Sequence, residues 1–136
     1  MKRLFLVVFL LLTIFLLFCL FIFLNIFIIG RVKEVSTIGI RDLYVTNEKV
    51  SFSMIFSTSA DTMSKYSYRI ENNIMYIKIR SVLVGIIGIS DNVEIEGDFI
   101  DIEIIILEDN DGKKIIWDKN DQDKYLNKDG FNIIVY

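Results

Sequence analysis

The sequence predicts an all-β domain, an immunoglobulin-like or fibronectin-like β-sandwich of about seven strands, behind one N-terminal transmembrane helix. The helix is indicated by 26 uncharged positions from Leu4 to Ile29. The strands are indicated by short segments in which apolar and polar residues alternate, a pattern typical of half-buried strands. The composition agrees, because proline is absent, alanine occurs only at Ala60 and isoleucine is abundant. A small β-barrel is the alternative architecture.

The apolar run is long enough to cross a bilayer and stay there. At ~1.5 Å per residue it extends ~39 Å, against ~30 Å of hydrocarbon. A cleaved signal peptide has an apolar core of only about 7–15 residues followed by small residues, which this run lacks. Lipidation at Cys19 is the other alternative, and Phe18 argues against it because such cleavage needs a small residue there. We therefore expect contact with the lipid bilayer through residues 4–29.

The expected domain organisation has three parts. Residues 1–30 form a signal-anchor helix, residues 31–37 a short linker and residues 38–136 the β-sandwich. Lys2, Arg3 and the α-amino group precede the span, which modestly favours a cytoplasmic N-terminus and an extracytoplasmic C-terminal domain. The expected location is the cell membrane, with a single pass.

The first strands follow from alternation. Ile38 to Thr46 and Lys49 to Ser57 are candidate strands, with Ile55 as the one apolar residue that faces outward. In Tyr66 to Glu71, alternation places Tyr66, Tyr68 and Ile70 on the apolar face. Asn72-Asn73 then predicts a tight turn, because Asn tolerates positive φ. The hairpin closes with Ile74 to Arg80, where the inward residues are Met75, Ile77 and Ile79.

A second hairpin is expected later in the chain. Isoleucines at 100, 102, 104 and 106 alternate with acidic residues, and Asp109-Asn110-Asp111-Gly112 supplies a turn in which Gly112 permits a left-handed position. Lys113 to Trp117 is the returning strand. The remaining candidate strands are Asn92 to Glu96 and Phe131 to Tyr136.

Composition excludes several kinds of chemistry. Histidine is absent and the single cysteine lies in the span, so the usual proton shuttle, thiol nucleophile and zinc ligands are missing from the domain. No S-x-x-K or G-x-S-x-G pattern indicates a serine nucleophile. We expect no enzyme, no catalytic residue, no cofactor site and no metal site. Residues 31–90 carry a charge of +3 and residues 91–136 a charge of −8, so we expect no nucleic-acid partner.

Three segments are weighed as functional surfaces. Val82 to Ile89 is nearly all apolar and is either a buried strand or a docking patch. Glu108 to Asp111, joined by Asp118, Asp121 and Asp123, offers oxygen ligands for calcium but lacks the spacing of a calcium loop, so a plain turn is favoured. In Tyr66 to Arg80 the aromatics suggest a recognition surface, and alternation favours core packing instead.

The segment Tyr66 to Arg80 resembles uncharacterised small membrane-anchored or lipoprotein-type β-sandwich proteins of low-GC Gram-positive bacteria. The resemblance also includes Val50-Ser51-Phe52-Ser53 and Gly97-Asp98-Phe99-Ile100. The resemblance covers residues 38 to 118. It implies a bacterial cell-surface β-sandwich and carries over no catalytic or binding residue. The lipoprotein members would have a lipidation cysteine, which this chain lacks.

These observations leave a noncatalytic interaction or accessory module, anchored by a single pass at the bacterial cell surface, as the expected function. Its partner would be a protein of the membrane or envelope. One alternative is an immunity-type or inhibitory protein whose acidic half binds a basic toxin or enzyme. Another is a calcium-dependent surface-binding module.

Overall fold

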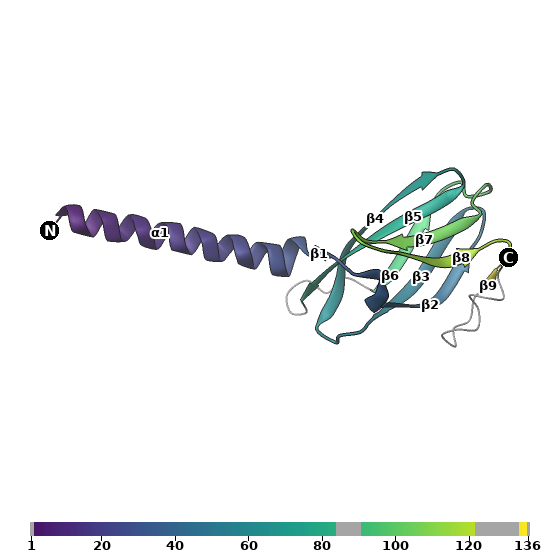
Figure 1. Ribbon diagram of the computed structural model, residues 1–136, viewed down its shortest axis with the longest axis horizontal. Helices are drawn as coiled ribbons and strands as arrows, with labels where there is room; N and C mark the ends of the chain where they lie inside the picture. Colours follow the sequence, from purple (N-terminus) through teal and green to yellow (C-terminus); the bar gives the residue numbers. More distant parts are fainter. Residues whose placement is uncertain (1, 84–90, 122–133, 136) are drawn as a thin grey trace.

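The chain forms one long helix followed by a two-sheet β-domain, as Figure 1 shows. The computed structural model describes residues 2–83, 91–121 and 134–135. Helix α1 (Lys2–Leu24) continues into a π-helical turn, η1 (Asn25–Ile29). A 3₁₀ turn, η2 (Val35–Thr37), precedes the domain's first long strand. The strands are β1 (Arg31–Val32), β2 (Ile38–Val45), β3 (Lys49–Phe56), β4 (Asp61–Glu71), β5 (Ile74–Leu83), β6 (Asn92–Glu96), β7 (Ile104–Glu108), β8 (Lys113–Asp118) and β9 (Ile134–Val135).

The helix is apolar on every side. No residue of α1 is buried, and α1 with η1 is long and apolar enough to span a membrane. At ~1.5 Å per residue the two segments extend about 42 Å, which exceeds the hydrocarbon thickness of ~30 Å. A signal sequence near the N-terminus meets the same criterion of length and composition.

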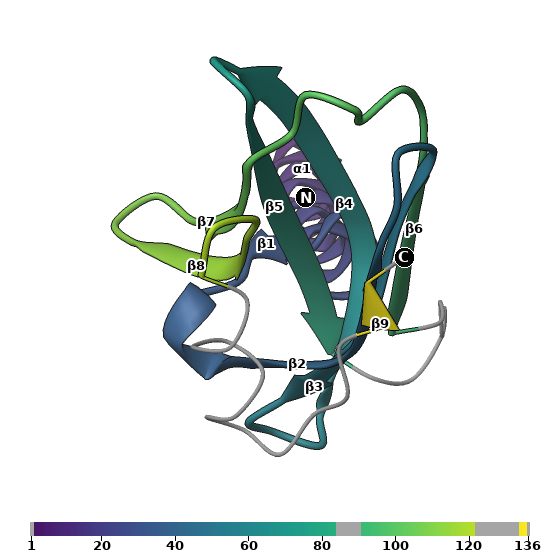
Figure 2. The same ribbon diagram turned by 90° about the vertical axis from the view of Figure 1, so that its right-hand side faces the viewer.

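The two sheets share one hydrophobic core. In the five-stranded sheet, β5 pairs with β4 along one edge and with β7 and β1 along the other, and β8 lies beyond β7. The four-stranded sheet has the order β6-β3-β2-β9. The pairs β5–β7 and β2–β9 are parallel and the other pairs are antiparallel. Figure 2 looks along the domain and shows the two sheets as separate layers. An all-β two-sheet fold is therefore confirmed at this level.

The alternation patterns place the core correctly over most of the domain. Met75, Ile77 and Ile79 of β5 are essentially inaccessible to solvent, and Ile55 of β3 is exposed as expected. Asn72 and Asn73 have positive φ values of 52° and 64°, so the two-residue hairpin turn is confirmed.

The segment expected to be a linker belongs to the sheet. Arg31 and Val32 form β1 and pair with Ser81 and Arg80 of β5. They can do so because β7 covers only the Ile74–Ile77 end of that edge and leaves the other end open. Val35 is buried in the core. The domain therefore begins directly after Gly30 rather than at residue 38.

The expected strand over Ile100 to Ile106 is shorter than its alternation suggests. Ile102 is buried and Ile100 is 57% exposed, but residues 100–103 form a turn and a loop, and the strand starts at Ile104. Gly112 has no positive φ. The turn is instead shaped by Asp109, whose Oδ1 accepts hydrogen bonds from the backbone N–H groups of residues 111 and 112.

Candidate functional site

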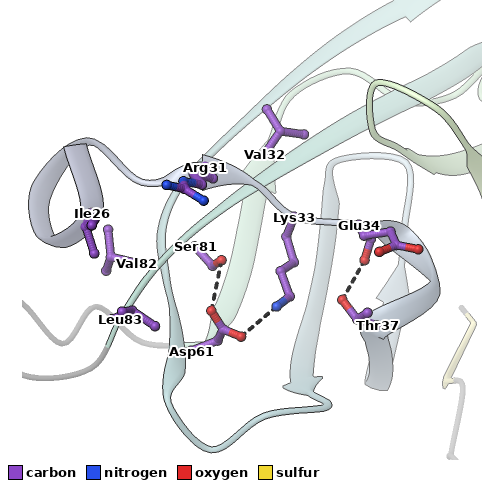
Figure 3. A pocket seen from close by; sticks show the side chains of 10 residues that line it. All are labelled: Ile26, Arg31, Val32, Lys33, Glu34, Thr37, Asp61, Ser81, Val82 and Leu83. Carbon is purple, nitrogen blue, oxygen red and sulfur yellow. Dashed lines mark hydrogen bonds and ion pairs between the residues drawn. The ribbon is translucent and has the colours of Figure 1, made fainter. Parts of the chain in front are cut away.

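The end of the sandwich nearest the helix contains a cavity of about 370 Å³, which is bounded by the last turn of the helix, the segment of residues 31–37 and the adjoining ends of β4 and β5 (Figure 3). Arg31 and Lys33 enter it from the segment after the helix, and Asp61 and Ser81 enter it from β4 and β5. Apolar side chains make another part of its wall, namely Ile26, Val32, Val82 and Leu83. We call this space the junction cavity.

An ion pair lies at the centre of the junction cavity. Lys33 Nζ is 2.6 Å from Asp61 Oδ2, and both side chains are less than one-fifth exposed. Asp61 also accepts hydrogen bonds from Thr58 and from Ser81 Oγ, the latter at 3.3 Å. Burial alone would raise the pKa of Asp61, but these hydrogen bonds and the charge of Lys33 lower that pKa below its ordinary value. The carboxylate is therefore ionised and satisfied at neutral pH.

Arg31 differs from Lys33 in having no side-chain partner among the described residues. It is exposed, and in Figure 3 it lies between the helical turn that carries Ile26 and the Asp61–Lys33 pair. An Arg without a carboxylate partner keeps its full set of guanidinium donors available for a ligand. The sequence signal for this site was a basic pair just after an apolar run, whereas nothing in the sequence linked that pair to Asp61 or Ser81.

The opposite end of the sandwich carries a different surface. The β2–β3 turn (residues 46–48), the loop of residues 97–103 and the β4–β5 turn (72–73) are tied together by backbone hydrogen bonds. These bonds join Gly97 N to Glu48 O, Phe99 N to Asn47 O and Glu103 N to Asn73 O at 2.7–3.0 Å. We call these residues the distal loop cluster. They contain four acidic residues and no basic residue, the acidic ones being Glu48, Asp98, Asp101 and Glu103, all exposed.

The tip of the β4–β5 hairpin overhangs the opposing sheet beside this cluster. Tyr66 is the last inward residue of β4 that the other sheet covers, and its hydroxyl donates a hydrogen bond to the carbonyl of Glu94 in β6. Tyr68 and Ile70, on the same face, are 45% and 44% exposed. The expectation that both pack in the core is wrong, because β4 has eleven residues and β6 only five.

The acidic turn after Leu107 is engaged in structural contacts. Glu108 is buried and forms a bidentate ion pair with Arg69, and Asp109 Oδ2 accepts a hydrogen bond from Val35 N at 2.7 Å. Hydrogen bonds from the backbone of Val35, Asp111 and Gly112 lower the pKa of Asp109. Asp118 accepts from Asn120 N. No three acidic or sulfur side chains gather as a metal site within residues 2–83, 91–121 and 134–135, and Asp123 lies outside them.

The apolar segment Val82 to Ile89 is described only at its start. Val82 is buried at the end of β5 and Leu83 is 43% exposed, and both line the junction cavity. Residues 84–89 lie outside the described residues. Comparisons of the chain with protein-family models, curated proteins and solved structures found no match.

Proposed function

We propose that this protein is a single-pass, membrane-anchored, noncatalytic interaction module of the bacterial cell surface. Its N-terminus would be cytoplasmic and its sandwich extracytoplasmic, in keeping with Lys2 and Arg3 before the span. The helix leads into β1 without a flexible spacer. A retained helix would therefore hold the sandwich close to the bilayer and raise its effective concentration toward a partner in the same membrane.

The observation that carries the proposal is the surface at the end of the sandwich away from the helix. The distal loop cluster is acidic, and the hairpin tip beside it exposes Tyr68 and Ile70. Exposed aromatic and aliphatic residues next to charged ones are typical of protein interfaces, where aromatic anchors provide much of the affinity. The partner that fits is a protein with a basic surface around an apolar patch.

An immunity-type or inhibitory role is the second candidate, and the same acidic cluster favours it. A basic toxin or enzyme would face the four carboxylates of the distal loop cluster, and the cluster itself contains no basic residue. The two candidates differ in when the partner is present, since an accessory module binds a resident protein and an inhibitor binds an incoming one. The calcium-dependent alternative is not favoured, because Glu108 and Asp109 are already used in structural contacts.

We further propose that the two-sheet architecture is immunoglobulin-like or fibronectin-like. An immunoglobulin-like or fibronectin-like sandwich is built of two antiparallel sheets, whereas β5–β7 and β2–β9 are parallel here. We retain the immunoglobulin-like description for the two-layer architecture and not for the strand connectivity. The absence of enzymatic activity is proposed on composition, since the chain has no histidine and its one cysteine lies in the helix.

The test is affinity purification of the tagged full-length protein from native membranes in mild detergent, at low and high salt, with copurifying proteins identified. We expect a stoichiometric partner at low salt that is partly lost at high salt. Replacing Tyr68 and Ile70 by Ser should weaken capture by about 2 kcal/mol or more, as for interface anchors. The matched control is Ile55→Ser, which changes an exposed residue on β3 away from the hairpin tip.

Charge is tested separately. The variants Asp98→Asn and Asp101→Asn should reduce capture at low salt and flatten its salt dependence. Asp111→Asn makes the same change of charge in the β7–β8 turn at the other end of the sandwich, and it should have no effect. Purification of the bare protein at low salt, or capture that ignores all these substitutions, would contradict the proposal.

A further inference from the structure

The junction cavity has the two-sided lining expected of a site for an amphipathic ligand. On one side are the guanidinium of Arg31, the Asp61–Lys33 pair and the hydroxyl of Ser81. On the other are the apolar residues Ile26, Val82 and Leu83. Its volume of about 370 Å³ falls within the range of small-ligand sites, ~300–1,000 Å³.

This inference rests on the membrane anchoring proposed above. With the helix spanning the bilayer, the position of the junction cavity along the chain determines its depth relative to the membrane. The candidate span ends at Ile29, and Arg31 follows two residues later. Arg and Lys side chains at such a position lie at the level of the lipid headgroups. The half-buried residue Ile26 belongs to the last turn of the span, so the apolar wall of the cavity is continuous with the hydrocarbon region.

We propose that the junction cavity binds the phosphate headgroup of an anionic membrane lipid. Arg31 donates hydrogen bonds to the phosphate, and the apolar wall contacts the glycerol and the first acyl carbons. Lys33 balances the charge of Asp61, and the remaining carboxylate, Glu34, is exposed, so water and salt screen its repulsion of a phosphate. A lipid fits better than free phosphate because inorganic phosphate has no apolar part that could contact the apolar wall.

The register of β1 on β5 supplies a matched control. Arg31 lies opposite Ser81 and Val32 opposite Arg80, so Arg80 is only one residue farther from the span than Arg31. Ser81 is buried and its neighbour Arg80 is exposed, because successive side chains of a strand point to opposite faces. Arg31 lines the junction cavity together with Ser81, whereas the exposed Arg80 is not among the residues that line it.

The experiment uses the full-length protein in nanodiscs of phosphatidylcholine with and without phosphatidylglycerol. The lipids that stay bound after release from the discs are counted by native mass spectrometry. We expect preferential retention of phosphatidylglycerol by the wild type, about a tenfold loss in Arg31→Gln, and no loss in Arg80→Gln, since a hydrogen bond to a charged group is typically worth a factor of about ten or more. Arg31→Lys should recover part of the retention, because it keeps the charge and loses the planar donor fork.

Each failure has a distinct meaning. A protein that does not enter the discs would overturn the membrane anchoring and this site together. Insertion with equal losses in Arg31→Gln and Arg80→Gln would overturn the cavity site alone and indicate general surface attraction. Displacement of the lipid by millimolar inorganic phosphate would overturn the assignment to a lipid in favour of a free anion.

Discussion

Gly30 is the residue on which the joint between helix and sandwich depends. Its φ of 73° lies in the left-handed region. A Cβ at this position would come within 2.6 Å of both Ser81 O and Ser64 Oγ. The chain can leave the helix and join β5 at once only because position 30 carries no side chain.

We predict that Gly30→Ala destabilises this joint by at least about 1–3 kcal/mol, because the backbone conformation of Gly30, with φ 73° and ψ 169°, is open essentially only to glycine and the close contacts add to the cost. The readout is protease sensitivity around residues 30–33 in the detergent-solubilised full chain, with thermal unfolding as a second measure. Gly39→Ala is the control, because a Cβ there meets only ordinary contacts at 3.6–3.8 Å. Equal behaviour of the two variants would contradict the structural role of Gly30.

Asp109 connects the β7–β8 turn to the start of the domain through charge as well as geometry. Its carboxylate accepts hydrogen bonds from the backbone of Val35, Asp111 and Gly112, and these bonds lower its pKa. A group whose pKa is lower in the folded state stabilises the fold above its unfolded pKa of about 3.9. That contribution is lost as the pH falls from about 4 through the folded value.

We therefore predict that Asp109→Asn lowers the free energy of unfolding at pH 7 and makes its decline below about pH 4 shallower. One oxygen remains in the variant, so the N–H of the buried Val35 loses its acceptor. Urea unfolding at pH 7 and at pH 3 provides the measurement. Asp111→Asn, in the same turn and exposed, should leave both values unchanged, and an unchanged acid profile in Asp109→Asn would show that this carboxylate does not contribute.

At the scale of elements, the length of a strand relative to its opposite sheet decides which apolar residues are buried. Alternation correctly assigned β3 and β5 to inward and outward faces, because each is paired on both sides. It failed at Tyr68 and Ile70, where β4 extends past the other sheet. Periodicity reports the face on which a side chain lies but not how far the opposing layer reaches.

The same limit explains the other differences from the sequence. The sequence predicts a linker where β1 forms, because two residues carry no periodicity. The pairing of β1 depends on the open edge of β5, about fifty positions later in the chain. The junction cavity could be anticipated only from Arg31 and Lys33, since its other polar residues, Asp61 and Ser81, are brought there by the β4–β5 hairpin. Long-range pairing of this kind leaves no local signal in one sequence.

The loop of residues 97–103 gives a direct test at this scale. Ile102 is 4% exposed and Ile100 is 57% exposed, although a continuous strand would place both on the same face. We predict that Ile102→Ala costs about 2–5 kcal/mol of unfolding free energy, whereas Ile100→Ala changes it by less than about 0.5 kcal/mol. Comparable losses in denaturant unfolding of the two variants would indicate that residues 100–106 form one strand after all.

At the scale of the whole molecule, the two ends of the sandwich differ in charge and in what they expose. The end near the helix has Arg31 and, one residue farther from the span, Arg80, and the far end has the acidic distal loop cluster. Within residues 2–83 and 91–121, every buried hydrophobic residue of the core belongs to position 35 or later. The helix therefore supplies no residue of this core.

Because no helix residue belongs to the core, we can predict how a fragment of residues 31–136 behaves. It should keep the folded core, because no core residue is removed, but its first residues should fray. β1 pairs over only two residues, and the half-buried turn that contains Ile26 would no longer flank it. Hydrogen exchange should therefore rise at residues 31–33, including the Lys33 N–H that bonds to Ile79 O, and stay unchanged in β2 and β3. Loss of protection from hydrogen exchange throughout the core would instead mean that the helix is required for the fold. Unchanged protection at residues 31–33 would mean that β1 does not depend on the helix.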